Sequence, residues 1–198
     1  MDRRKKYTQS TLKECLVDLL KQKPITSITV KELCEAADVN RSTFYSHYDN
    51  HFDLLEKLGE DVIFDMERTL AEFNFGTERE SLQMTERALQ YIAEKYDVCE
   101  VLLSSHGDMN FKKRVMDLLL PVILEKLNAE LQLKRQLSEY KLLLLISGSI
   151  AVVERWLENG RQETPEQIAA LIHQFTNHGL VGDSPHCVKA PGDCPLLR

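Results

Sequence analysis

Residues 39–55, VNRSTFYSHYDNHFDLL, gather polar and aromatic side chains of the kinds that contact other molecules. A helical wheel, turning about 100° per residue, places Phe44 and Tyr48 on one face of a helix predicted from Arg41 to Tyr48. Together with Val39 they form the expected buried side. The opposite face carries hydroxyl groups, an imidazole and a phenol, supplied by Ser42, Thr43, Tyr45, Ser46 and His47.

This outer face has an unusual composition for a helix surface that meets only water. Glu and Lys are common on such surfaces because they favour helix and solubility, whereas Ser, Thr and His are poorer helix formers. The major groove of DNA admits one helix, and short side chains let its backbone approach base edges and phosphates. We therefore favour a DNA-contacting face over a solvated one. Arg41, in the first turn, is the best candidate for bidentate contact with a guanine.

The preceding segments must position this helix. From Thr8 to Lys23, apolar residues recur at helical spacing on one stripe, and Pro24 helps to end the helix. A second short helix follows, in which Thr29 and Glu32 have the spacing of a capping box. Asp38 falls at the turn, where a short polar residue tolerates a left-handed backbone.

Asn40 is a good N-cap for the helix that starts at Arg41, and Val39 with Phe44 forms a hydrophobic staple at its entry. Asn50 is expected to cap a fourth helix that runs to about Phe73. Two short helices joined by a tight turn, with a helix before and after, predict a helix-turn-helix domain.

Charge is distributed unevenly along the chain. The net charge is −6, yet residues 1–50 carry +2 and residues 51–198 carry −8. The positive charge is concentrated in Arg3, Arg4, Lys5 and Lys6. A basic head on an acidic body suits a protein that contacts nucleic acid through one end.

No apolar run reaches the roughly 18 residues of a membrane span, and no apolar region follows the charged N-terminus, so we expect a cytoplasmic protein. Five cysteines, an odd number, agree with a reducing compartment. Cys187 and Cys194 lie beside His186 in a proline-rich segment at the C-terminus. We expect a flexible tail over 181–198 rather than a metal clip or disulfide, since further ligands at zinc-like spacing are missing.

Beyond the break at Asn74 to Gly76, helices are predicted at about 78–96, 98–105, 110–135, 138–159 and 165–178. Pro121 should kink or split one of them. Residues 142–153, LLLLISGSIAVV, are apolar nearly all round and should be buried on several sides, in part by a second copy of the chain. The fold class is therefore all-α, with about nine helices.

Residues 28–58, ITVKELCEAADVNRSTFYSHYDNHFDLLEKL, resemble the TetR family of bacterial transcriptional regulators (TetR/AcrR type), over about residues 8–65. A weaker resemblance to the C-terminal domains of Firmicutes-type members covers 147–172, which contains WLENG and TPE. This chain has Asp38 where the family turn usually has Gly, and His51 where a lysine is common. The resemblance implies a helix-turn-helix domain over 1–50, continuing through the linking helix to about 65, and a helical regulatory and dimerisation domain over 51–180.

The resemblance also implies roles for individual residues. Arg41, Ser42 and Thr43 would face bases, while Tyr45, His47 and His51 would hold phosphates. Thr29 and Lys31 would reach the DNA backbone. Arg3, Arg4, Lys5 and Lys6 would form an arm along the minor groove.

The functional expectation is a homodimeric, sequence-specific DNA-binding regulator that reads a palindromic operator, a repressor released by a small-molecule ligand. The dimer would form through the last two long helices. The alternative is a TetR-like activator or coactivator controlled by a protein partner, and pocket volume would discriminate the two, because a filled core points to a protein signal. Ligand-lining candidates are left unassigned, since aromatic residues and Met at helical spacing are mostly core: Tyr91, His106, Met109, Phe111, Met116 and Trp156.

Catalysis is not expected. No nucleophile–base pair, metal-ligand spacing, cofactor motif or glycine-rich phosphate loop is present. The basic run Lys112-Lys113-Arg114 is interpreted as a solvated face.

Overall fold

The computed structural model describes residues 3–71, 77–108, 110–130 and 135–181. Within these ranges the chain forms nine α-helices and one short 3-10 helix and contains no strand, so the predicted all-α class is confirmed. The helices are α1 (Arg3–Leu20), η1 (Ile25–Ser27), α2 (Val30–Ala36), α3 (Arg41–Tyr45), α4 (His51–Ala71), α5 (Glu78–Glu94), α6 (Tyr96–Leu103), α7 (Phe111–Glu130), α8 (Arg135–Glu158) and α9 (Pro165–Val181). The predicted tail lies outside the described residues.

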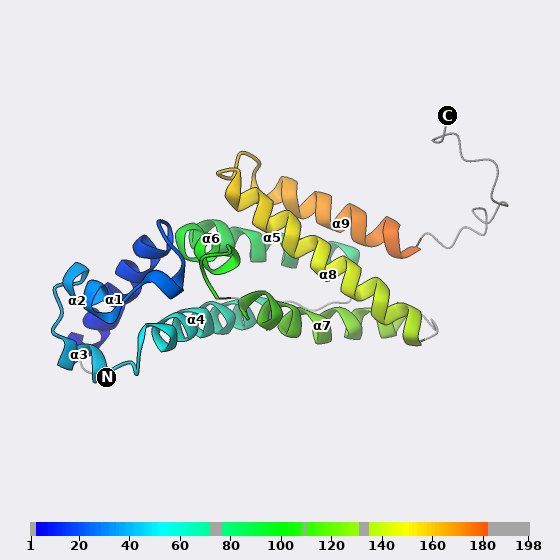
Figure 1. Ribbon diagram of the computed structural model, residues 1–198. Helices are drawn as coiled ribbons and strands as arrows, with labels where there is room; N and C mark the ends of the chain where they lie inside the picture. Colours follow the sequence, from blue (N-terminus) through cyan, green and yellow to red (C-terminus); the bar gives the residue numbers. More distant parts are fainter. Residues whose placement is uncertain (1–2, 72–76, 109, 131–134, 182–198) are drawn as a thin grey trace, which may run out of the picture.

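The first three α-helices form one end of the molecule, which we call the head (residues 3–50), and α4 leads from it into the body (residues 51–181) (Figure 1). The head core contains the side chains predicted from helical spacing. Fully buried members are Leu12, Leu16, Leu20, Leu33 and Phe44. Burying a leucine or phenylalanine contributes roughly 1.5–3 kcal/mol, so this small core can fix the angle between α2 and α3.

The boundaries of two head helices differ from those predicted. Helix α1 begins at Arg3 rather than Thr8, because Arg and Lys are good helix formers and no Gly or Pro separates them from the apolar stripe. Helix α3 ends at Tyr45 rather than Tyr48. The Ser46 hydroxyl donates to the Thr43 carbonyl at 2.6 Å, and such a local bond competes with continuation of the helix.

The caps on either side of α3 follow the prediction. Asn40 Oδ1 accepts from the Ser42 amide at 2.9 Å. Asn50 Oδ1 accepts from the amides of Phe52 and Asp53 at 2.9 and 3.0 Å, and Asp53 in return accepts from the Asp49 amide at 3.0 Å. The bonds to the amides of Ser42, Phe52 and Asp53 pair donors that a helix start leaves unsatisfied, so the starts of both α3 and α4 are capped.

The body is a helical bundle in which α5 packs along α9, α7 packs against α8, and α4 contacts both α5 and α7. Helix α7 runs from Phe111 to Glu130 with Pro121 inside it, so of the two predicted effects, a kink or a split, the split is wrong. Pro121 is exposed, so the carbonyl group that loses its usual amide partner can be hydrogen-bonded by water. In the 142–153 segment, Leu142, Leu145 and Ile146 are buried, but Leu143 and Leu144 remain exposed within one chain.

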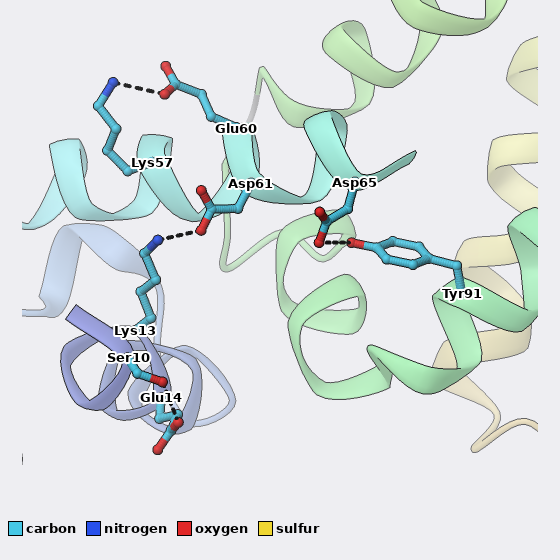
Figure 2. A network of polar contacts seen from close by, with 8 residues as sticks. All are labelled: Ser10, Lys13, Glu14, Lys57, Glu60, Asp61, Asp65 and Tyr91. Atoms are coloured by element: carbon cyan, nitrogen blue, oxygen red, sulfur yellow. Dashed lines mark hydrogen bonds and ion pairs between the residues drawn. The ribbon is translucent and has the colours of Figure 1, made fainter. Parts of the chain in front are cut away.

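Polar contacts join the head to the body. Lys13 of α1 forms an ion pair with Asp61 of α4, and further along α4 the Tyr91 hydroxyl donates to Asp65 at 3.4 Å (Figure 2). Lys21, at the end of α1, binds Asp97 of α6 at 2.6 Å. Exposed ion pairs stabilise little, but these fix the register of α1 against two body helices.

The turn between α2 and α3 has a residue in the left-handed conformation, Asp38, with φ of 51°. Left-handed backbone costs an ordinary L-residue roughly 1–2 kcal/mol, and glycine avoids this cost but loses more entropy on folding. We expect Asp38→Gly to raise the free energy of unfolding by about 0.5–1 kcal/mol, and Asp38→Ala to lower it. Urea denaturation followed by circular dichroism measures both. If Asp38→Ala had a higher free energy of unfolding than Asp38→Gly, the left-handed backbone at position 38 would not be the source of strain.

Candidate functional site

The outer face of the helix-turn-helix is formed by short and aromatic side chains of α3. Phe44 is fully buried beneath it, while Arg41, Ser42 and Tyr45 are exposed and Thr43 is half-buried. This arrangement matches the predicted helical wheel. The structure thus brings the three expected base-contacting residues, Arg41, Ser42 and Thr43, to the first turn of one helix.

Ser42 has a structural role as well. Its hydroxyl donates to Asn40 Oδ1 at 3.1 Å, so the donor is used within the cap. The hydroxyl oxygen keeps its lone pairs, and on a base edge it could accept a hydrogen bond from the amino group of adenine or cytosine. Because its donor is used in the cap, the Ser42 hydroxyl can act toward DNA only as an acceptor.

The two aromatic side chains expected to hold phosphates are braced by the core. The ring of Tyr45 meets Phe44 edge to face, with centroids 5.5 Å apart and an interplanar angle of 89°. His47 is half-buried, with its ring centroid 6.2 Å from that of Tyr48. Such contacts restrict side-chain rotation, which lowers the entropy cost of fixing these groups against a ligand.

Thr29 and Lys31 lie at the start of α2. Thr29 Oγ1 accepts from the Glu32 amide at 3.2 Å, which confirms the N-cap. The reciprocal half of the predicted capping box is replaced, because the Glu32 carboxylate accepts from Lys23 Nζ at 2.7 and 2.8 Å. Lys31 is 66% exposed and only 3.8 Å from Glu35, an ion pair weak enough to give way to a phosphate.

His51 is the first residue of α4, and its ring centroid lies 4.2 Å from that of Phe52. Partial burial lowers the pKa of His51 below its ordinary value of 6.5. The imidazole is therefore neutral at physiological pH. A phosphate contact here would favour the charged form, so such a contact would be coupled to proton uptake.

The predicted N-terminal arm is not a separate extended segment, since Arg3, Arg4, Lys5 and Lys6 form the exposed first turn of α1. No acidic residue occurs in that turn. Positive side chains at the N-terminus of a helix oppose its dipole, whereas an anion there is favourable. An anionic partner at the first turn of α1 would relieve this opposition.

A second candidate site is an apolar cavity inside the body, with a volume of about 190 Å³. Its walls come from α4, α5, α6, α7, α8 and α9, and the α4 side includes Val62, Met66 and Leu70. Of the six unassigned aromatic and Met candidates, Phe111 lines it, and Met109 lies outside the described residues. Tyr91 instead donates to Asp65, and Trp156 Nε1 donates to the Glu163 carbonyl at 2.9 Å. Met116 packs partly buried against the core.

Sequence reasoning missed most of the cavity wall, because its residues are ordinary helix-core side chains. Cys99 is a wall residue of this kind, and burial raises the pKa of its thiol to about 12. It stays protonated and behaves as a small apolar group. Only the packing of six helices reveals which core positions border empty space.

The loop between α6 and α7 connects the cavity with the head. Leu103 and Phe111, which flank this loop, both line the cavity. In this loop, the His106 carbonyl accepts from the Ile25 amide at 3.0 Å, and His106 Nδ1 lies 3.1 Å from the Leu20 carbonyl. Because a carbonyl only accepts, Nδ1 carries the hydrogen, so His106 makes two bonds to the head.

The expectation of a solvated basic face at 112–114 is wrong for Arg114. Its guanidinium forms an ion pair with Asp108 and lies 5.8 Å from the Phe111 ring centroid. A Cβ on Gly59 of α4 would collide with it. Arg114 Nε is buried without a hydrogen-bond partner among the described residues. This arginine therefore packs α7 closely against α4.

Two other kinds of site were tested over the described ranges. No helix there is long and apolar enough to cross a membrane. No group of three His, Cys, Asp or Glu side chains in that part of the chain could hold a metal ion. His186, Cys187 and Cys194 fall outside it.

Residues 79–178 match the family model of the transcriptional regulator C-terminal region of the TetR type. The chain is 25% identical, over 179 residues, to the HTH-type transcriptional regulator YxbF of Bacillus subtilis (strain 168). That alignment covers 85% of this chain and 44% of the relative, so the chain spans under half of YxbF.

Solved structures share the fold at lower identity. A TetR transcriptional regulator from Streptococcus agalactiae 2603V has a TM-score of 0.66 and 24% identity, over 88% of this chain and 96% of that one. The regulator FadR from Bacillus subtilis, solved in complex with stearoyl-CoA, has a TM-score of 0.63 and 14% identity, over 84% and 96%. The chain belongs to the TetR family of transcriptional regulators.

The lowered pKa of His51 gives a test of its predicted phosphate contact. Because the free imidazole is neutral at about pH 7.5 and charged only below its lowered pKa, DNA affinity at fixed salt should strengthen as the pH falls toward about 6. His51→Lys should bind more tightly at about pH 7.5, with a salt dependence steeper by about one phosphate contact. Fluorescence anisotropy with a labelled operator duplex measures both quantities.

His51→Gln is the matched control, since it removes the titration without adding a charge. Its affinity at about pH 7.5 should equal that of the wild type, and its affinity should gain less at low pH. Equal pH profiles for the wild type and both variants would rule out a phosphate contact at this position.

Proposed function

We propose that this protein is a cytoplasmic, dimeric repressor that binds a palindromic operator through α3 and is released by a small-molecule ligand bound in the body cavity. The observation that carries the proposal is that one helix, α4, follows α3 directly in the chain, packs against α1 of the head with its first half and lines the cavity with its second half. A surface with base-contacting chemistry and an apolar site are thus joined by one rigid element.

The proposed roles at the DNA follow the geometry of the head. Arg41 contacts a guanine, and Ser42 and Thr43 contact neighbouring base edges. Tyr45, His47 and His51 hold phosphates on one side of the groove, with Thr29 and Lys31 on the other. The first turn of α1, with Arg3, Arg4, Lys5 and Lys6, attracts the DNA electrostatically. Residues 1–50 are the proposed DNA-binding domain and 51–180 the regulatory and dimerisation domain.

The dimer is supported by exposed apolar side chains on two neighbouring helices. Tyr140 and Leu144 of α8 are 73% and 68% exposed, and Phe175 of α9 is 62% exposed. Leu143 of α8 and Leu171 of α9 are exposed as well, and α8 and α9 lie side by side (Figure 1). An apolar patch of this kind marks an interaction site, and a second copy would bury it as a four-helix interface.

The cavity favours a small molecule over a protein as the signal. An engineered apolar cavity of about 150 Å³ stays dry and binds benzene, and the cavity here is somewhat larger, at about 190 Å³. A regulator controlled only by a protein partner would have no need of this unfilled volume, which lowers stability. The alternative of a protein-controlled activator is therefore the weaker one.

The binding test uses DNA duplexes that the wild-type protein selects from a random pool. On these duplexes, substituting two cationic residues should change affinity and sequence preference in different ways. Arg41→Ala should cost about 1–3 kcal/mol and relax preference at one position of each half-site. Lys31→Ala should weaken all duplexes about equally and reduce the salt slope by about 1. If Arg41→Ala leaves affinity and preference unchanged at fixed salt, α3 is not the reading helix.

The dimer assignment predicts that Leu144→Glu separates the subunits. An unpaired carboxylate buried in an apolar interface costs several kcal/mol, so the dimer should weaken about 100-fold or more. Phe64→Glu is the control, because Phe64 is 59% exposed on α4 and does not belong to the patch. Sedimentation equilibrium measures both variants, and a dimer of unchanged strength in Leu144→Glu would contradict the proposed interface.

A further inference from the structure

Among the residues whose side chains the structure describes, none in the cavity wall carries a permanent charge: no Asp, Glu, Lys or Arg of that set lines it. Its two titratable groups are the Cys99 thiol, which burial keeps protonated, and His173, whose Nε2 lies 3.2 Å from the Glu78 carbonyl near the cavity surface. A charged ligand would lose its hydration there and meet no counter-charge.

Charged residues near the wall are held in other contacts. Arg114 forms its ion pair with Asp108, and Lys112 binds Glu154 at 2.6 Å. Asp65 accepts from Tyr91 on the far side of α4. Drawing Arg114 or Lys112 into the cavity would leave its carboxylate partner without an opposite charge, a substantial cost in partly buried surroundings.

The polar atoms of the wall come mainly from hydroxyl groups of α5, α8 and α9, namely those of Ser81, Thr85, Ser149 and Thr176. Thr85 donates to the Ser81 carbonyl at 3.0 Å, and Thr176 donates to the Ile172 carbonyl at 2.7 Å. Each threonine oxygen therefore offers only lone pairs to a ligand. A hydroxyl group on the ligand could donate to them.

We infer that the cavity selects an uncharged, mainly apolar compound somewhat larger than benzene that carries a single hydroxyl group, and rejects carboxylates and ammonium ions of the same size. This inference rests on the proposed ligand control of the same cavity. The predicted ligand class differs from an anionic ligand such as the stearoyl-CoA of the FadR complex, since a phosphate-bearing group would find no cation among the described residues of this wall.

The test uses three probes with one ring and nearly the same reach: 2-phenylethanol, phenylacetate and 2-phenylethylammonium, each titrated into the full-length protein at neutral pH. We expect 2-phenylethanol to raise Tm saturably, by about 3–6 °C at ten times its Kd. Phenylacetate and 2-phenylethylammonium should bind about tenfold more weakly or worse. An ion that binds as tightly as the alcohol would overturn the inference, and so would the absence of saturable stabilisation by all three.

Ala88→Leu locates the binding, because Ala88 lines the cavity and the substitution adds three carbon atoms to it. Binding of 2-phenylethanol should weaken about tenfold, whereas Ala71→Leu, at an exposed position outside the wall, should bind as the wild type does. Equal binding by all three proteins would place the alcohol elsewhere and overturn the inference.

Operator affinity measured with and without the alcohol separates this inference from the proposed function. If 2-phenylethanol binds the cavity and operator affinity does not change, ligand control fails while the ligand class stands.

Discussion

The structure depends on one helix, α4, whose apolar face packs against the head with its first half and lines the body cavity with its second half. Leu54, Leu55 and Leu58, in the first half of α4, are buried against the head, and Val62, Met66 and Leu70, in the second half, line the cavity. These side chains recur at helical spacing, so the apolar face is continuous and the buried residues of head and body form one cluster. A rigid helix cannot adjust to one core without moving against the other.

The contacts around α4 limit how it can move. The collision that a Cβ on Gly59 would make with Arg114 shows that α4 and α7 are in close contact at the level of Phe111. On the opposite side Lys13 ties α1 to Asp61, and the α6–α7 loop binds the head through His106. A ligand that separates α4 from α7 would therefore act on the head at two points. In the proposed repressor, such a displacement would change the spacing of the two reading helices in the dimer.

Much of the head could be predicted from sequence, because its features are local. Asn40 and Asn50 are caps, Asp38 adopts the left-handed turn and Phe44 is buried, all as spacing and residue type indicated. The helical state of Arg3 to Lys6 was missed because the family resemblance implied an arm, although the same residues have high helix propensity. The replacement of the Glu32 cap bond by Lys23 depends on a contact between two segments, which spacing within one helix does not indicate.

The cavity could not be predicted for a related reason. Leu118, Val153 and Ala88 are typical core residues, and whether they meet a neighbour or empty space is decided by the relative positions of six helices. Likewise, the sequence 142–153 indicated burial on several sides, but Leu144 is exposed and Ile146 is buried, a difference that depends on where the neighbouring helices α6, α7 and α9 lie.

In the proposed function, ligand binding in the cavity and DNA binding by α3 are coupled. Thermodynamic linkage allows this coupling to be measured through ligand affinity. If a ligand weakens operator binding by some factor, a bound operator must weaken ligand binding by the same factor. The direct measurement is the Kd of 2-phenylethanol for the dimer with and without a saturating operator duplex. The account predicts a Kd raised about 5- to 150-fold on the operator, by the same ratio that the alcohol imposes on operator affinity. An identical Kd in the two titrations would contradict it.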